Sequence, residues 1–245
     1  MYLLIPAAGK GTRMGSDRNK LLLPLLDQPL LYWTLLAAAT SKEIQWIGII
    51  GQSEDFADFK TIIADLSHRS QDLKSCDTAC DCLPQSLSKP VELILGGTTR
   101  QESVYKGLKA LPTSAEHVLI HDGARCLATP ELFDRCAEAL KTCQGLIAAI
   151  PVKDTIKIVD EKGFIIDTPD RNQLWAAQTP QGFDVKLLKQ SHDKGHQLGW
   201  EVTDDAALFE KCELPVKIVP GEETNLKVTT PVDLAIAEYI LRQRL

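Results

Sequence analysis

The chain lacks long hydrophobic runs and a net positive charge, and each absence removes a class of proteins. Its longest apolar stretches, such as GLIAAIPV at 145–152, fall far short of the roughly 18 residues that a membrane span needs. The first residues resemble a strand rather than a signal peptide, so we expect a cytoplasmic protein, or a plastid stromal one in its mature form. A formal net charge of −6 argues against nucleic-acid binding, so local bases must attract any anionic substrate.

The cysteines also lack the even number of a disulfide framework. There are seven, which favours a reduced, cytosolic protein. Three of them, Cys76, Cys80 and Cys82, form a C-x3-C-x-C cluster. We favour a solvated loop over a structural zinc site there, because four ligands at an established spacing are missing.

The hydrophobic pattern alternates between two kinds of segment. Short apolar runs at 2–6, 46–50, 91–95, 117–122 and 145–151 predict buried strands. Stretches at 28–42, 53–66, 100–111 and 129–141 predict helices. Such a series predicts an α/β fold: a Rossmann-like, mostly parallel twisted sheet with helices on both faces, in a single domain over 1–245. Ligands are expected outside the carboxyl ends of the strands.

Two segments interrupt this alternation. Residues 67–90 are polar and unpatterned, which predicts a surface insertion. Residues 153–175 alternate apolar and polar residues around the turn sequence DEKG, which predicts a protruding β-hairpin arm. An isolated two-stranded arm is marginally stable in water, so we expect it to pack on a second subunit of a homodimer.

The first predicted strand runs directly into PAAGKGTRM, at 6–14. Small residues let backbone N–H groups approach an anion or a flat base. The glycine spacing fits neither the Walker loop nor the dinucleotide fingerprint. Two bases follow instead, Arg13 and Lys20, and fixed positive charges suit a polyphosphate. The alternative is a glycine-rich turn with a solvated basic flank.

Seven blocks of the chain carry a resemblance to a known family. They are PAAGKGTRMGSDRNK at 6–20, GGTTRQESVYKGL at 96–108, VLIHDGAR at 118–125, PVKDTIK at 151–157, DRNQLWAAQTPQGF at 170–183, TDDAALFE at 203–210 and NLKVTTPVDLAIAE at 225–238. In these blocks the chain resembles the methylerythritol phosphate cytidylyltransferases, which belong to the pyrophosphorylase-like nucleotidyltransferases. The resemblance implies transfer of CMP from CTP to 2-C-methyl-D-erythritol 4-phosphate, with release of pyrophosphate, in the non-mevalonate route to isoprenoids.

The resemblance also implies roles for individual residues. Arg13 and Lys20 match the bases that stabilise the transition state, and Arg171 and Lys227 match the pair that positions the attacking phosphate. The expected nucleotide contacts are Ala7, Ala8, Gly9, Gly11, Gly96, Gly97, Ser103, Asp122 and Gly123. Asp122 could also hold Mg²⁺, directly or only through water or phosphate. The expected contacts to the acceptor substrate are Arg125, Thr155, Thr179 and Thr203.

The implied site is shared between subunits. Thr155 and Arg171 would reach the neighbouring subunit's site. That neighbour, which holds the CTP, would contribute Thr179, Thr203 and Lys227. No nucleophilic side chain or general base is needed, since a phosphate monoester is already anionic. His192 and His196 are spaced i, i+4 on a polar helix and are expected to be solvated.

Each of these residues also has a purely structural interpretation. Asp122 and Arg125 could form an ion pair, and Thr203 could cap the helix at 204–212. Asp204 and Asp205 would then sit in the first helical turn, where the helix dipole accounts for both.

Two other functions compete with this assignment. A ribitol-5-phosphate or other sugar-phosphate cytidylyltransferase would share the opening loop, although the former tend to open with AGG where this chain has Ala7, Ala8 and Gly9. A non-catalytic nucleotide-binding regulator is the remote alternative. Such a sensor has no need of two bases aimed at a leaving group and two more at an acceptor.

Overall fold

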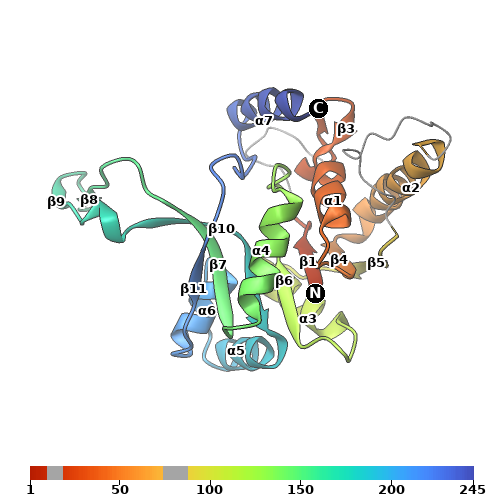
Figure 1. The fold of residues 1–245 in the computed structure, drawn as a ribbon. Helices are drawn as coiled ribbons and strands as arrows, with labels where there is room; N and C mark the ends of the chain where they lie inside the picture. Colours follow the sequence, from red (N-terminus) through yellow and green to blue (C-terminus); the bar gives the residue numbers. More distant parts are fainter. Residues whose placement is uncertain (10–18, 74–87) are drawn as a thin grey trace.

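The structure, a computed structural model, describes residues 1–9, 19–73 and 88–245 (Figure 1). The strands of its main sheet are β1 (Tyr2–Pro6), β4 (Trp46–Gly51), β5 (Val91–Leu95), β6 (His117–Ile120), β7 (Gly145–Pro151), β10 (Trp175–Asp184) and β11 (Lys217–Pro220). Its α-helices are α1 (Leu30–Thr40), α2 (Phe56–Leu73), α3 (Arg100–Ala110), α4 (Pro130–Leu140), α5 (Val185–Gln197), α6 (Asp205–Lys211) and α7 (Pro231–Arg244). The shorter elements are η2 (Lys20–Leu22), β2 (Pro24–Leu25), β3 (Gln28–Pro29), η3 (Ser53–Asp55), β8 (Ile158–Val159), β9 (Ile165–Asp167) and η4 (Arg171–Gln173).

The seven-stranded sheet has the order β11-β7-β10-β6-β1-β4-β5. Adjacent strands pair in parallel except at β10, which is antiparallel to both β6 and β7. The predicted α/β fold with a mostly parallel sheet is therefore confirmed. The predicted strands at 2–6, 91–95 and 145–151 match β1, β5 and β7 residue for residue.

Helices cover both faces of this sheet, as predicted. Alternate residues of β1 separate the two layers: Leu3 and Ile5 pack with α1, α2, α4 and α7, whereas Leu4 packs with α3, α5 and α6. All three side chains are fully buried. Successive side chains of a strand point to opposite faces of the sheet, and both faces of β1 are buried. Every residue in its centre is therefore hydrophobic.

Threonines fix the starts of three helices. The hydroxyls of Thr99, Thr129 and Thr230 accept hydrogen bonds from backbone N–H groups in the first turns of α3, α4 and α7. Such caps satisfy N–H groups that have no partner within the helix. They also fix where each loop between strand and helix must end, and these loops carry the site residues.

Three features of the fold differ from the sequence-based expectation or extend it. Helix α2 continues to Leu73, inside the stretch 67–90 that we expected to be unpatterned. Residues 74–87 of that stretch lie outside the described residues, as do its three cysteines. β10 and β11 were not predicted as strands. In β10, Pro180, Gly182 and buried polar side chains mask the strand pattern.

The arm at 153–175 extends away from the sheet as a continuation of β7 and β10 (Figure 1). Its tip is a two-stranded antiparallel pair of β8 and β9. Asp160 accepts hydrogen bonds from the backbone N–H groups of Lys162 and Phe164, and Gly163 has a φ of +84° in the turn. The predicted hairpin is present, but its paired strands are short. Among the described residues, no helix has the length and apolarity that crossing a bilayer requires.

Candidate active site

The segments that follow four parallel strands converge on one pocket of about 700 Å³. They follow β1, β4, β5 and β6, and a loop after β11 adds Lys227. This edge is where an open α/β sheet places its ligands. The pocket brings together nine of the predicted residues, which are Ala7, Ala8, Gly9, Lys20, Gly97, Ser103, Asp122, Gly123 and Lys227.

One wall of the pocket is the loop between β5 and α3. The N–H of Gly97 donates to the Ser103 hydroxyl at 2.9 Å, and that hydroxyl donates to the Thr99 carbonyl at 2.8 Å. A Cβ at position 97 would lie 2.4 Å from the Glu102 side chain, so the backbone can follow this path only with glycine. These contacts fix the path of the loop, in which Gly96 is buried.

The opposite wall begins at β1. Ala7 is tied to β4 through its N–H, which donates to the Ile50 carbonyl at 2.7 Å. Its own carbonyl accepts from the Asn19 amide at 2.6 Å, which fixes the residue before Lys20. The Lys20 ammonium donates to the Val228 carbonyl at 3.2 Å. Lys20 is thus directed toward the loop that carries Lys227.

Asp122 is the acidic residue that pairs with basic side chains of the pocket. Its carboxylate lies 2.6 Å from the Lys227 ammonium and 3.8 Å from Nε of Arg100. Burial acts to raise the pKa of Asp122, but the charges of Lys227 and Arg100 outweigh it and lower that pKa to about 2. Asp122 is therefore ionised at neutral pH.

Thr179 and His121 hold the backbone of Asp122 from behind. The Asp122 N–H donates to the Thr179 hydroxyl at 3.0 Å, and that oxygen lies 3.0 Å from Nδ1 of His121. Nε2 of the same ring lies 3.2 Å from the Arg125 carbonyl, which can only accept. The ring therefore carries its proton on Nε2, and burial lowers its pKa to about 4.

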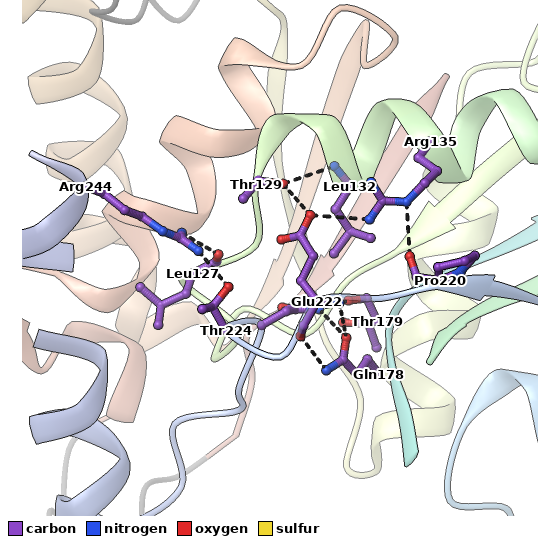
Figure 2. Close-up of polar contacts among 11 residues, drawn as sticks. Leu127, Thr129, Leu132, Arg135, Gln178, Thr179, Pro220, Glu222, Thr224 and Arg244 are labelled. Carbon is purple, nitrogen blue, oxygen red and sulfur yellow. Dashed lines mark hydrogen bonds and ion pairs between the residues drawn. The ribbon is translucent and has the colours of Figure 1, made fainter. Parts of the chain in front are cut away.

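A polar network around Glu222 holds the loop that carries Lys227 (Figure 2). The Gln178 side chain of β10 bonds both the N–H and the carbonyl of Glu222, at 3.2 and 2.9 Å. The Glu222 carboxylate accepts from Thr129, the N-cap of α4, and from Arg135 in the middle of that helix. A Cβ on Gly221 would lie 2.4 Å from Oε1 of Gln178, so a side chain there would displace this amide from its bonds to Glu222.

Several predicted site residues do not line the pocket. Arg125 donates to the carbonyls of Asn225 and Ala177, at 2.7 and 3.3 Å. Thr155 and Arg171 are exposed on the arm, where Arg171 donates to the Lys153 carbonyl at 2.8 Å. The alternative interpretation of Arg125 is an ion pair with Asp122. The Arg125 guanidinium instead bonds these two backbone carbonyls.

The remaining predicted positions are Thr203, Arg13 and Gly11. Thr203 is exposed and is not the cap of α6; that cap is Asp204, whose carboxylate accepts from the Ala207 N–H. The expected capping role of Thr203 is therefore wrong. Arg13 and Gly11 lie outside the described residues.

Sequence reasoning missed a buried charge cluster behind the pocket. Asp205 lies in the first turn of α6, as expected, but it is buried, and the expectation that His192 is solvated is wrong: both side chains are 2% exposed and lie 3.4 Å apart. The missed signal is helical spacing. Asp205 precedes Leu208 and Phe209 by three and four residues on the buried face of α6. In the same way, His192 follows Leu188 by four on the buried face of α5.

Fold and site together define the class of the protein. A glycine-lined pocket at the carboxyl edge of a parallel sheet, with Lys20, Arg100 and Lys227 at its walls, belongs to a nucleotide-binding α/β protein equipped for phosphate groups.

Comparison with known proteins then places the chain within that class. Residues 1–243 match the family profile of 2-C-methyl-D-erythritol 4-phosphate cytidylyltransferase. The chain is 70% identical over its whole length to the protein of that name from Crocosphaera subtropica, of which it covers 99%, and 69% identical to that from Microcystis aeruginosa, of which it covers 100%. It also resembles the crystal structure of 4-diphosphocytidyl-2C-methyl-D-erythritol synthase from Anaerococcus prevotii, with a TM-score of 0.79, 33% identity and coverage of 98% and 97% of the two chains. The chain belongs to the 2-C-methyl-D-erythritol 4-phosphate cytidylyltransferase family.

Proposed function

We propose that the chain transfers CMP from CTP to 2-C-methyl-D-erythritol 4-phosphate, giving 4-diphosphocytidyl-2-C-methyl-D-erythritol and pyrophosphate in the non-mevalonate isoprenoid pathway. The observation that carries this function is the family match over residues 1–243, joined to a pocket lined by three basic side chains and an ionised aspartate. An oxygen of the acceptor phosphate attacks the α-phosphorus of CTP, and the bond to the bridging oxygen breaks. Catalysis then consists of positioning and neutralising charge.

The proposed site residues, in the pocket and beyond it, divide into two groups. The loop at 96–103 and the small residues after β1 bind the cytidine and the phosphates. Lys20, joined by Arg13, neutralises the charge that develops on the departing pyrophosphate. Lys227 and Arg171 hold the acceptor phosphate, with Arg125, Thr155, Thr179 and Thr203 on the acceptor side. The location of Lys20 and Lys227 in one pocket supports this division.

We propose Mg²⁺ as the divalent cation. No group of three or more His, Cys, Asp or Glu side chains within 1–9, 19–73 and 88–245 could hold a metal ion by itself. Mg²⁺ binds through one or two carboxylates together with substrate phosphates and water. The single ionised carboxylate of Asp122 in the pocket fits that mode, and the ion would supply charge neutralisation at the phosphates.

A homodimer joined through the arm is a further part of the proposal. Several apolar side chains of the arm are exposed in the single chain, including Phe164 at 68%, Ile165 at 61% and Ile166 at 64%. Burying them against a second copy would remove this apolar surface from water. It would also bring Thr155 and Arg171 to a pocket, since neither lines the pocket of its own chain.

We propose that residues 1–245 form one domain and act in the cytoplasm. One sheet takes its strands from Tyr2 to Pro220, which supports a single folding unit. The four described cysteines, Cys126, Cys136, Cys143 and Cys212, are free thiols, as in a reducing compartment.

A panel of acceptors tests the function. With CTP and Mg²⁺, pyrophosphate should be released when 2-C-methyl-D-erythritol 4-phosphate is supplied, and little should be released with ribitol 5-phosphate. Turnover of ribitol 5-phosphate alone would overturn the acceptor assignment. Binding of CTP without pyrophosphate release from any acceptor would instead favour a regulator.

A further inference from the structure

A buried ion pair connects the pocket to the second layer of the protein. Arg100 is the first residue of α3 and lines the pocket, and its Nη1 lies 2.8 Å from the Asp205 carboxylate. The Arg100 side chain is 30% exposed and that of Asp205 is 2% exposed. Arg100 therefore spans from solvent in the pocket to a carboxylate that solvent does not reach.

Arg100 is shared unequally between two carboxylates. Its Nε is 3.8 Å from Asp122, an ångström farther than the contact to Asp205. Asp122 has the Lys227 ammonium at 2.6 Å as its nearer counter-charge. The geometry therefore assigns Arg100 mainly to Asp205, and a guanidinium has further N–H donors that this contact does not use.

We propose that Asp205 is a positioning residue that anchors Arg100 at the wall of the pocket, so that the free donors of the guanidinium face the phosphates of bound CTP. This inference rests on the proposed placement of CTP. An unanchored arginine must lose side-chain freedom when phosphate binds, whereas an anchored one is already ordered. Asp205 also keeps Arg100 from closing fully onto Asp122, which leaves the Asp122 carboxylate accessible to the pocket.

Asp205 is suited to this role by its own surroundings. It is the first residue of α6, where the helix dipole favours a negative charge. Nε2 of His192 lies 3.4 Å from it, and that ring stacks on Tyr105 of α3 with ring centroids 5.5 Å apart. α3, α5 and α6 thus hold the carboxylate at a fixed place. Burial acts to raise the pKa of Asp205, but the charge of Arg100 outweighs it, so that pKa is lowered.

The test compares Asp205→Asn with Asp204→Asn. Both variants remove one formal charge at the same helix end, and asparagine caps helices as well as aspartate does. Asp204 contacts the side chain of Gln181 and the N–H of Ala207, not Arg100. We expect Asp205→Asn to weaken CTP binding, measured by titration calorimetry with Mg²⁺, about tenfold to a hundredfold, as when a residue that orients a metal ligand is lost. We expect Asp204→Asn to change it less than about threefold.

A double-mutant cycle separates positioning from general structural damage. If Asp205 acts through Arg100, adding Asp205→Asn to Arg100→Ala should produce little further loss of CTP affinity, because the residue to be positioned is gone. Additive losses in the double variant would overturn the inference. So would equal CTP affinities for Asp205→Asn and Asp204→Asn.

Asp205→Glu is the second variant, for the case in which Asp205→Asn does not fold. It keeps the charge beside Arg100 and should retain more CTP affinity than Arg100→Ala; affinity as low as that of Arg100→Ala would contradict the inference. Wild-type protein that binds CTP without releasing pyrophosphate would overturn the proposed function, while the titrations would still decide the inference. Wild-type protein that does not bind CTP would overturn both.

Discussion

The Lys227 ammonium lies 2.6 Å from the Asp122 carboxylate, which joins the loop after β11 to the loop after β6. The backbone strengthens the same junction, because the Val228 N–H donates to the Ala124 carbonyl at 2.9 Å. A base proposed to hold the acceptor phosphate thus rests on the acid proposed to act at the nucleotide phosphates. Ligands that carry their own charge would compete for both partners.

Replacing Lys227 with alanine should therefore impair the acceptor step. We expect kcat/KM for 2-C-methyl-D-erythritol 4-phosphate to fall about a hundredfold or more, because a cation aimed at reacting phosphate is lost. Steady-state release of pyrophosphate measures this loss. Lys217→Ala is the matched control, since Lys217 is exposed on β11 outside the pocket. A loss in Lys227→Ala no greater than that of the control would refute the role of Lys227.

Replacing Lys20 with alanine should separate catalysis from binding. The charge that Lys20 is proposed to neutralise develops as pyrophosphate departs, so kcat should fall about a hundredfold while the Kd for CTP changes only a few-fold. Rapid-quench turnover and calorimetric CTP titration measure the two quantities. Lys60→Ala, on an exposed position of α2, serves as the control. An unchanged kcat, or equal losses in kcat and CTP affinity, would contradict a role confined to the transition state.

Subunit mixing tests whether the arm completes a neighbouring site. Arg171 is exposed on the arm and Lys20 lies in the pocket, so in a shared site the two residues come from different chains. Mixing inactive Arg171→Ala with inactive Lys20→Ala should restore up to about a quarter of the wild-type activity, because random pairing leaves one intact site in half of the dimers. If the mixture stays as inactive as its components after exchange of subunits, each chain supplies its own arm.

The sequence predicted five strands of the central sheet, β1, β4, β5, β6 and β7, because each is a largely apolar run. It did not predict β10, whose buried Gln178 and Gln181 serve polar networks at the centre of the sheet. The residues near each glutamine in the sequence do not reveal its hydrogen-bond partner, because that partner lies 20 or more residues away along the chain. A strand whose buried polar side chains form hydrogen bonds in the core lacks the apolar pattern of a strand, so its sequence resembles that of a loop.

In the candidate site, too, some residues could be predicted from local sequence and others could not. The glycine-rich loops could be located from sequence because each directly follows a predicted strand, and Asp122 because it ends one. The burial of Asp205 could not be read from its charge, since an acid in a first helical turn is ordinarily exposed. Its placement depends on Arg100, which reaches it from the other side of the pocket wall.

The last prediction concerns pH and His121. In the folded chain the pKa of His121 is lowered by burial to about 4, whereas in an unfolded chain it is about 6.5. Above pH 6.5 the ring is neutral in both states. As the pH falls from 6.5 to 4, the unfolded state takes up a proton that the folded state does not. His121 should therefore cost the folded state about 3 kcal/mol over that interval.

Urea denaturation at a series of pH values measures this loss. His121→Gln should be less stable at pH 7, because it loses contacts to Thr179 and Phe133, yet its stability should fall less steeply between pH 6.5 and 4. His196→Gln, at an exposed position of α5, should follow the wild-type slope. Protonation would place a second N–H of the ring against the Thr179 hydroxyl, which now donates to it and accepts from the Asp122 N–H. If His121→Gln and the wild type fell in parallel, the proton would be taken up elsewhere, and His121 would not link acid stability to the backbone of Asp122.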